Sequence, residues 1–345
     1  MMSWCARFIW AKTLSYAGKI LPNPEAMRLI ISENKDVYFN LALEDVLLHG
    51  TDEDILMLWQ SRSAVVCGKH QNLCGEANYG YCKNHNIDLA RRLSGGGTVY
   101  HDEGNVNFTF IQNLKPHEEL NINFRKFLDP MMEVLAALGV NTTYSGRNDL
   151  LLNGLKISGN AEHLHQQSRR ILHHGTLLFD SKLDTLGEAL HSQGQYESKA
   201  VKSVRSKVGN IKAHTAFEHV QDFIAALAAG FKVKFGYIAS EITIEENTKA
   251  QELKTSKYAT DEWISGYSPA YRVEKELILY NKSVKIALSV HKGIISEAVI
   301  MEGAEERLNA AVSSLTGKPL STETEQRFFA SLNMPYTEEL KYALF

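Results

Sequence analysis

The sequence is poor in the residues that build disulfide frameworks and zinc sites, and it has no long apolar run. Its 345 residues include four cysteines, which are Cys5, Cys67, Cys74 and Cys82. No two of them have CxxC spacing, and no histidine cluster near them completes a zinc site. No apolar run reaches the roughly 18 residues that cross a bilayer. We therefore expect a protein of a reducing compartment with no membrane partner.

The chain also lacks an excess of positive charge and the glycine fingerprint of dinucleotide-binding folds. Its formal net charge is −3, which excludes an overall basic field for nucleic acid. A GxGxxG motif at a strand-to-helix turn is absent. The composition, 44% hydrophobic and 22% charged, is typical of a folded protein, and the length suits two domains rather than one core.

The first 26 residues carry basic side chains but no acid before Glu25. Such a stretch suits a transit peptide, which would direct the protein to the mitochondrial matrix. It also suits an extra stretch upstream of a genuine start at Met27, where a strand-like run begins. The second interpretation is favoured and predicts a cytoplasmic protein. In both, residues 1–26 are an N-terminal extension outside the fold.

Apolar patterns predict strands and helices in mixed order. Strands are expected at 27–32, 55–59, 64–67, 87–91, 106–110, 150–152, 155–157 and 171–179, and helices at 36–49, 76–85, 124–138 and 217–231. The strand at 106–110 alternates apolar with polar residues and is expected to be half-buried. Asn153-Gly154 favours a tight hairpin turn. This order predicts an α+β fold rather than a doubly wound sheet.

The C-terminal part predicts a second, smaller domain. Residues 245–265 are polar and rich in lysine and glutamate, and they are interpreted as a connector. Beyond them, strands at 274–280, 284–290 and 294–301 and helices at about 304–315 and 322–332 are expected. We therefore predict domains at 27–262 and 271–345.

The run RRLSGGGTVYHD at 91–102 is the strongest candidate for a site. Three consecutive glycines remove every Cβ from a short loop, so that its backbone can press against a ligand and aim N–H groups at it. Two arginines precede the glycines, and a His-Asp pair follows them. This combination suits a phosphate or an activated carboxylate. The alternative for a bare GGG is a flexible turn.

A second motif places a lysine among small residues. GRND at 146–149 is followed by NGLKISGNA at 153–161. Leu155 and Ile157 flank Lys156 in the expected strand and therefore face the opposite side of the sheet. Gly159 lets a ligand approach nearby, and a compact ammonium opposite a glycine loop suits a phosphate or carboxylate. The alternative is an outward, solvated lysine.

Two further motifs have weaker signals. HHGT at 173–176 begins an apolar strand, and the adjacent spacing of its histidines favours packing or hydrogen bonding over a metal site. SVRSKV at 203–208 forms a basic loop between helices, for which a solvated basic surface is the alternative.

Together these residues closely resemble the lipoate–protein ligase A family and its relative lipoyltransferase, from about Met27 to the C-terminus. The segments ARRLSGGGTVYHDEGN, SGRNDLLLNG, LKISGNAEH, HHGTLL and SVRSKV occur in the family order. The joint match is very specific, whereas a lone GGG would not be. The resemblance implies a large mixed-sheet catalytic domain of the biotin/lipoate ligase type with a small C-terminal accessory domain.

The resemblance also implies roles for particular residues. The loop 91–98 would bind lipoate, through Ser94, Gly95 and Gly96. Nucleotide-contacting positions are matched by Arg92, Gly97, Thr98, Val99, Tyr100 and Lys156. Lys156 matches the lysine that touches both the acyl carbonyl and the phosphate, and is therefore the expected catalytic residue. The loop that closes over the adenylate is matched at 203–207, by Ser203, Val204 and Arg205.

The implied reaction uses ATP, Mg²⁺ and lipoate. Family members form lipoyl-AMP and pyrophosphate, then pass the lipoyl group to a lysine Nε of a lipoyl domain of 2-oxoacid dehydrogenase E2 subunits or of the glycine cleavage H protein. Fixed cations, Mg²⁺ and aimed N–H groups can stabilise the charge that builds on the phosphorus oxygens. The apolar lipoyl tail requires a tunnel of side chains such as Leu, Val and Phe. The metal ligands stay open, with Asp149 a candidate.

Four alternatives follow from the same residues. A biotin–protein ligase is disfavoured because its GRGRxGR-type loop is absent, and a cysteine-dependent octanoyl transferase because no cysteine follows Cys82. A lipoyltransferase that uses only preformed lipoyl-AMP would carry the same loops. Gly175 and the 203–208 loop favour the full ligase. A non-catalytic module that binds lipoyl-AMP or a carrier protein is disfavoured because Lys156 and the glycine loop are retained.

Overall fold

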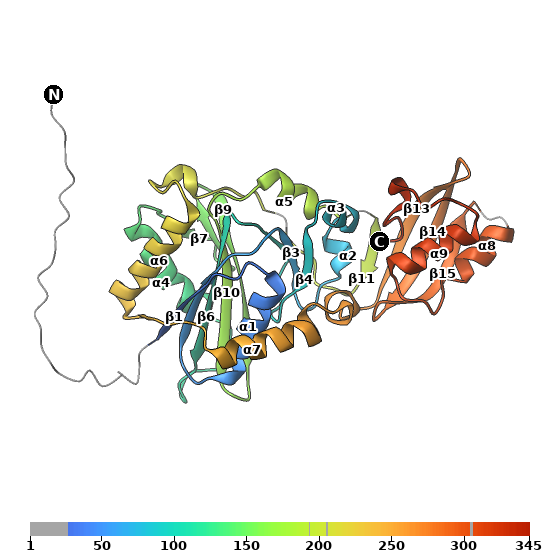
Figure 1. Cartoon of the computed structure of the whole chain (residues 1–345). Helices are drawn as coiled ribbons and strands as arrows, with labels where there is room; N and C mark the ends of the chain where they lie inside the picture. Colours follow the sequence, from blue (N-terminus) through green and yellow to red (C-terminus); the bar gives the residue numbers. More distant parts are fainter. Residues whose placement is uncertain (1–26, 193, 205, 304–305) are drawn as a thin grey trace, which may run out of the picture.

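In the computed structural model, residues 27–192, 194–204, 206–303 and 306–345 are described (Figure 1). They form three sheets with helices packed on them, which confirms the α+β class. Within these ranges, no helix is long and apolar enough to cross a membrane. The predicted extension at 1–26 lies outside the described residues, so both interpretations of it stay predictions.

The largest sheet has eight strands and is mixed. In spatial order they are β12 (Ile238–Ala239), β1 (Arg28–Ser32), β2 (Ile55–Trp59), β6 (Asn105–Asn113), β10 (Arg170–Leu178), β9 (Leu155–His165), β8 (Asp149–Leu152) and β7 (Thr143–Tyr144). β1 is parallel to β2 and β12, whereas the strands from β2 to β7 pair antiparallel. The predicted hairpin turn joins β8 to β9, with positive φ at Asn153 (51°) and Gly154 (80°).

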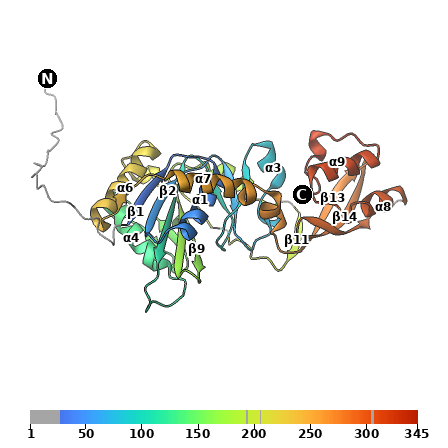
Figure 2. The ribbon, with the colours of Figure 1, turned by 60° about the horizontal axis from the view of Figure 1, so that its bottom comes forward.

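Helices cover both faces of this sheet (Figures 1 and 2). α4 (Phe124–Ala137) and α6 (Val220–Phe235) bury their apolar residues on one face, and α1 (Val37–Gly50) packs on the other. The expectation of a half-buried strand at 106–110 is therefore wrong, because β6 is buried on both faces from Asn105 to Ile111. Its polar residues face α1, and the sequence alternation reflects a polar cluster rather than solvent.

The second sheet has three strands, in the order β4 (Asp88–Arg91), β3 (Ala64–Cys67) and β5 (Val99–His101). The glycine loop connects β4 to β5. The helix expected at 76–85 is present but shorter, as α3 (Tyr79–Asn84), and a separate short helix that was not expected, α2 (Leu73–Glu76), precedes it. Asn78 separates them, since its side chain caps α3 by accepting from the backbone N–H of Tyr81. α5 (Leu183–Ala189) packs against α3.

Residues 245–265 are not a connector. They form α7 (Ile244–Leu253) and two π-helical turns (Lys254–Tyr258 and Glu262–Gly266), and α7 and the first turn pack against α1. Tyr258 is fully buried there and donates to Asp45 Oδ2 over 2.8 Å. The sequence pattern was misleading because a helix lying on another helix needs few apolar residues of its own. Short 3₁₀ turns occur at Lys212–His214 and Glu338–Leu340.

The third sheet lies at one end of the molecule (Figures 1 and 2). Its order is β11 (Gln195–Ser198), β13 (Tyr271–Leu279), β14 (Lys282–His291) and β15 (Ile294–Glu302), and α8 (Glu306–Ser313) and α9 (Thr322–Ser331) share its hydrophobic core. β11 comes from the part of the chain before residue 262, so this sheet includes a strand that the sequence did not predict. The Phe345 ring stacks on Tyr79 of α3, with 4.2 Å between ring centroids.

Candidate active site

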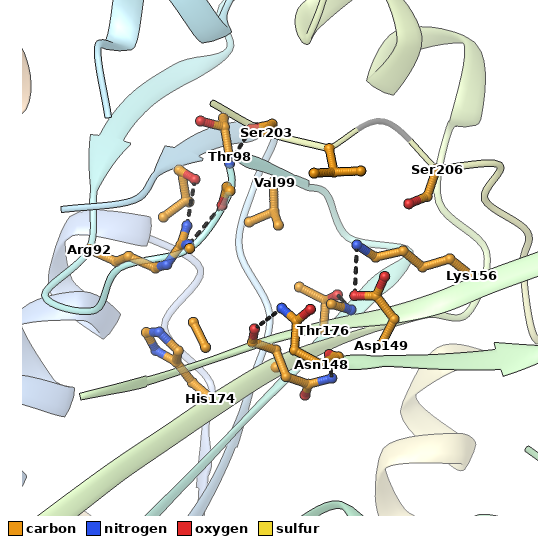
Figure 3. A pocket seen from close by; sticks show the side chains of 18 of the residues that line it. Arg92, Thr98, Val99, Asn148, Asp149, Lys156, His174, Thr176, Ser203 and Ser206 are labelled. Atoms are coloured by element: carbon orange, nitrogen blue, oxygen red, sulfur yellow. Dashed lines mark hydrogen bonds and ion pairs between the residues drawn. The ribbon is translucent and has the colours of Figure 1, made fainter. Parts of the chain in front are cut away.

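The glycine loop is held in shape by Arg92. This arginine is 5% exposed, and its guanidinium donates to the carbonyl oxygens of Val66 (3.0 Å), Gly95 (2.6 Å) and Gly97 (2.7 Å) and to Ser94 Oγ (3.0 Å). Burial lowers the pKa of Arg92 to about 10, so the side chain stays charged at neutral pH. A charged fork bound to three carbonyls is a strong constraint on a short loop (Figure 3).

Two glycines allow the backbone to pack this closely. Gly96 has φ +85°, and a Cβ there would lie 3.0 Å from Arg92 Nη2. A Cβ on Gly68, which follows β3, would overlap the carbonyl oxygen of Gly96. The loop is therefore a packed structure pressed against the end of β3, unlike the flexible turn that GGG alone allows.

A first cavity, of about 330 Å³, lies between this loop and the large sheet. Part of its wall is apolar and comes from Leu41 of α1, Trp59 of β2 and Val66 of β3. Another part is polar and includes Asp149 and Lys156 (Figure 3). The cavity thus offers an apolar chamber that ends near a charged pair.

A buried polar chain runs behind the apolar wall. His174 Nε2 lies 2.5 Å from Ser94 Oγ, and His174 Nδ1 lies 3.0 Å from Glu44 Oε2. Glu44 Oε1 accepts from Thr109 Oγ1, which in turn accepts from Trp59 Nε1. This chain links the cavity wall to the glycine loop through side chains that are almost fully buried.

Sequence reasoning missed Glu44. The sequence feature that could have revealed it is an acidic residue within the apolar stripe of α1, and in the structure Glu44 is 2% exposed. Buried carboxylates are costly unless they are paired, so such a residue indicates a polar partner elsewhere in the fold. The partner, His174, is 130 residues away in the chain and could not be assigned from spacing.

The two adjacent histidines of β10 face opposite sides of the sheet. His173 is fully buried, bonds Glu162 Oε1 at 2.9 Å and stacks on Phe127. His174 faces the cavity. The prediction of packing or hydrogen bonding for this pair is confirmed. Within the described part of the chain, no group of three His, Cys, Asp or Glu side chains could hold a metal.

Lys156 is the charged residue opposite the loop. Its Nζ lies 2.9 Å from Asp149 Oδ1, and its side chain is 23% exposed (Figure 3). Gly159 makes room for it, because a Cβ at Gly159 would lie 3.2 Å from Lys156 Nζ. The glycine therefore accommodates the lysine itself, in addition to any approach by a ligand that the sequence suggested.

A second cavity, of about 500 Å³, adjoins the first. Its wall comes from β5 at Val99 and Tyr100, from α2, from α5 and from β11. The linings of the two cavities have several residues in common, namely Thr98, Val99, Lys156, Gly159, Thr176, Lys202, Ser203, Val204 and Ser206. Lys156 therefore lies where the two cavities meet.

Residues 203–204 contact the glycine loop, and residues 206–208 lie beside Lys156. At one end, Ser203 Oγ accepts from the backbone N–H of Thr98 (2.9 Å) and from Gln71 Nε2 (3.1 Å). At the other, the backbone N–H of Lys156 donates to the carbonyl of Lys207 over 2.9 Å. The expected loop residue Arg205 lies outside the described residues. The segment follows β11 and not a helix.

The structure brings most of the predicted site residues together. Arg92, Gly96, Gly97, Thr98, Val99, Lys156, Ser203 and Val204 line the first cavity, and Tyr100 lines the second. Ser94 and Gly95 are not among the described residues that line either cavity. Ser94 is fully buried and contacts His174 and Arg92 instead, so a lipoate contact by its side chain requires a change of this arrangement.

Comparison with known proteins agrees with this geometry. Residues 36–232 match the lipoyl protein ligase A/B catalytic domain. Lipoate–protein ligase 1 of Staphylococcus aureus is 36% identical over 284 residues, which cover 79% of this chain and 84% of that protein. A lipoate–protein ligase of Bacillus subtilis is 33% identical over 282 residues, with the same coverage of both chains.

Solved structures show the same fold. Lipoate–protein ligase A bound with ATP superposes with a TM-score of 0.61 at 26% identity, covering 70% of this chain and 99% of that one. A Thermoplasma acidophilum lipoate protein ligase with bound lipoic acid gives 0.60 at 25% identity, with the same coverage. The chain therefore belongs to the lipoyl protein ligase A/B catalytic domain family, which confirms the resemblance seen in the sequence.

Proposed function

We propose that the chain is an ATP-dependent lipoate–protein ligase. It converts lipoate and ATP to lipoyl-AMP and pyrophosphate, then transfers the lipoyl group to a lysine Nε. The observation that carries this proposal is the position of Lys156 at the junction of two cavities, opposite the glycine loop. Residues 27–262 form the catalytic unit and residues 271–345 the accessory unit, with β11 joining the sheet of the latter.

The two cavities differ in the chemistry that they can hold. The first has an apolar wall of Leu41, Trp59 and Val66, which suits the lipoyl tail. The second lies beyond the glycine loop and includes Tyr100, while the cationic Lys202 lines both cavities; together they suit a nucleotide whose phosphates lie at the junction. The carboxylate of one ligand and the α-phosphate of the other then meet beside Lys156.

In the first half-reaction, a lipoate carboxylate oxygen forms a bond to the α-phosphorus as the bond to the bridging oxygen of the leaving pyrophosphate breaks. The Lys156 ammonium and the N–H groups of the loop stabilise the negative charge on the phosphorus oxygens. Arg92 contributes by fixing the loop, because its hydrogen bonds are made to loop carbonyls and Ser94. Ser203 and Val204, in the loop after β11, cover the adenylate.

In the second half-reaction, the acceptor amine attacks the acyl carbonyl, AMP leaves, and the amine loses a proton. Lys156 donates to the carbonyl oxygen as it becomes an oxyanion. The acceptors that suit this step are the lipoyl domains of 2-oxoacid dehydrogenase E2 subunits and the glycine cleavage H protein. A solved structure of a bipartite ligase from Thermoplasma acidophilum concerns that enzyme and its E2 lipoyl domain.

Mg²⁺ suits the first half-reaction, in which it neutralises charge on the phosphates. Asp149, which lines the first cavity and pairs with Lys156, is the candidate carboxylate for it. Mg²⁺ commonly binds through one or two carboxylates plus substrate phosphates, so a single aspartate fits this mode. Asp149 pairs with Lys156 in the structure and would be the residue that holds the metal when it is bound.

The proposal is tested by lipoate-dependent pyrophosphate release from purified protein. Release that requires both lipoate and ATP, followed by a mass increase of a lipoyl domain, is the expected result. Transfer from synthetic lipoyl-AMP without pyrophosphate release would instead identify a lipoyltransferase. Binding of lipoyl-AMP with neither reaction would identify a non-catalytic module.

The enzyme acts in a reducing compartment, which is the cytoplasm, or the mitochondrial matrix if residues 1–26 are a transit peptide. Cys67, Cys74 and Cys82 are free and buried, and burial raises the pKa of each thiol. They are therefore neutral and inert at physiological pH. Detection of the protein in the cytoplasmic or the mitochondrial fraction of cells that express the full-length sequence distinguishes the compartments.

A further inference from the structure

The buried amide of Gln71 joins three parts of the chain at the edge of the two cavities. Gln71 lies in the turn between β3 and α2 and is fully buried. Its Oε1 accepts from the backbone N–H of Gly68 (3.1 Å) and from Thr98 Oγ1 (2.8 Å). Its Nε2 donates to the carbonyl of Val201 (3.2 Å) and to Ser203 Oγ (3.1 Å). One side chain therefore connects this turn to the glycine loop and to the loop after β11.

The orientation of this amide follows from its partners. The N–H of Gly68 can only donate and the carbonyl of Val201 can only accept, so the oxygen and the nitrogen of the amide each have a fixed place. The amide accepts two bonds and donates two, which uses its whole capacity. Arg91 fixes the turn, since its Nη1 donates to the carbonyls of Gly68 (2.9 Å) and Gln71 (2.8 Å). The amide is therefore held in place before any ligand binds.

Residues 201–204, which we call the strap, lie at the edge of both cavities. All four line the first cavity, and the last three line the second. The strap approaches the glycine loop closely at Gly97, where a Cβ would lie 3.1 Å from Ser203 Oγ. Gln71 is not among the described residues that line either cavity. It can therefore act on a ligand only through the residues that it holds.

Apolar burial contributes little to the attachment of the strap. Val201 and Val204 are 50% and 66% exposed. The hydrogen bonds of Val201 and Ser203 therefore supply most of the attachment, and Gln71 makes one to each. A further bond comes from the backbone N–H of Ser203, which donates to Glu76 Oε1 of α2 over 3.2 Å. A segment held in this way is released when a single side chain loses its donors.

We propose that Gln71 is a positioning residue that ties the strap to the glycine loop and thereby retains the acyl-adenylate between the two half-reactions. This inference rests on the proposed function, because it takes the ligand at the cavity junction to be lipoyl-AMP. The adenylate is a reactive mixed anhydride, which water hydrolyses to lipoate and AMP once it leaves the site. A strap fixed over the junction keeps it beside Lys156 until the acceptor amine arrives.

Two substitutions separate the bonds that Gln71 makes. Gln71→Glu has the same shape, and an ionised carboxylate still accepts from the turn and the glycine loop but cannot donate to the strap. Gln71→Met has a similar length and removes all four bonds. Both should raise the dissociation rate of lipoyl-AMP by about 10-fold, the scale for two lost neutral hydrogen bonds, with little change in the Kd for lipoate alone. Gln167→Glu, at an exposed turn between β9 and β10, makes the same charge change and is the matched control.

Ser203→Ala removes the same bond from the side of the strap. It changes a half-buried side chain outside the hydrophobic core, so it keeps the test open if a Gln71 variant fails to fold. Ser203→Ala should also raise the dissociation rate of lipoyl-AMP. Combined with Gln71→Glu, its effect should be smaller than the product of the two separate effects, because both variants remove one common hydrogen bond. Effects that simply multiply would show that Gln71 does not act through Ser203.

The experiment has three measurements. The first is the displacement of radiolabelled lipoyl-AMP by an excess of the unlabelled compound. The second is pyrophosphate release without an acceptor, which should be a stoichiometric burst in the unaltered protein and should continue in both Gln71 variants, because the adenylate escapes. The third is hydrogen exchange of the Thr98 and Ser203 amides in the ligand-free protein, which should be faster in both variants because the strap is loosened.

A purely structural role of Gln71 would lower the melting temperature and weaken the binding of every ligand together. Such a uniform loss would overturn the inference, as would unchanged lipoyl-AMP dissociation with unchanged exchange at Thr98 and Ser203 in both folded variants. Absence of lipoate-dependent pyrophosphate release by the unaltered protein would overturn the proposed function alone, because amide exchange and synthetic lipoyl-AMP still test Gln71. Faster dissociation that Gln167→Glu does not share would support the inference.

Discussion

The two cavities are built from different kinds of structure. The wall of the first includes α1, β2 and β10, which belong to the core of the large sheet. The wall of the second comes largely from α2, α5, β11 and the loop after β11, which are short elements and loops. The cavity that we assign to the acyl group is therefore part of the folded core, whereas the cavity that we assign to the nucleotide is assembled by peripheral elements that link to the C-terminal sheet. Changes in the first should affect stability as well as binding, and changes in the second mainly binding.

Removing Lys156, one of the residues that line both cavities, should have the largest effect. Lys156→Ala should reduce adenylation and lipoyl transfer by at least about 100-fold, the usual scale for one oriented donor. Lys156→Arg should also fail, because a planar fork does not replace a compact ammonium. Lys212→Ala, which removes a surface ion pair with Asp180, is the control. Near-normal transfer from synthetic lipoyl-AMP by Lys156→Ala would show that the second step does not need this lysine.

A side chain in the loop between the cavities should block both ligands. Gly96→Val would force a β-branched residue to φ +85° and place its Cβ 3.0 Å from Arg92 Nη2. Gly139→Val is a matched control, since Gly139 has φ +86° but no atom lies within 4 Å of its Cβ position. Both variants should lose comparable stability, and only Gly96→Val should lose lipoyl-AMP binding by calorimetry. Equal binding by the two would make the loop a simple turn.

The buried chain behind the first cavity should contribute to stability. Glu44→Ala removes the partner of His174 Nδ1 and the acceptor of the Thr109 hydroxyl, and should lower the free energy of unfolding by about 1–3 kcal/mol. It should also weaken lipoate binding more than ATP binding. Glu44→Gln keeps an acceptor and should do less. Urea denaturation and calorimetry check these effects, and equal weakening of both ligands would contradict the separate roles of the cavities.

The smallest expected effect is that of changing Asp45, on the side of α1 that packs against Tyr258. Burial alone would raise the pKa of Asp45, but hydrogen bonds from His49, Lys257 and Tyr258 lower it well below its usual range. Because the folded pKa is depressed, Asp45 stabilises the fold above the unfolded pKa of about 4, and this stability is lost as pH falls. Asp45→Asn should therefore flatten the decline in unfolding free energy below about pH 4, measured by urea titration, without changing turnover at neutral pH.

Local patterns predicted much of the fold. The bounds of β2 and β3 and the turn at Asn153-Gly154 followed from apolar runs and turn chemistry. α7 was missed because its partner, α1, is distant in sequence and supplies most of the apolar surface. The glycine loop and Lys156 were found because their spacing carries chemistry. Glu44 was not found, since only the folded structure shows that its partner is His174.

The central claim is that Lys156 joins an acyl cavity to a nucleotide cavity. A crystal structure with a non-hydrolysable lipoyl-AMP analogue tests it most directly. We predict the dithiolane ring beside Leu41 and Trp59, the base beside Tyr100, and Lys156 Nζ within hydrogen-bonding distance of the acyl oxygen and the phosphate. An analogue bound with its acyl chain in the second cavity, or with no contact to Lys156, would contradict the account.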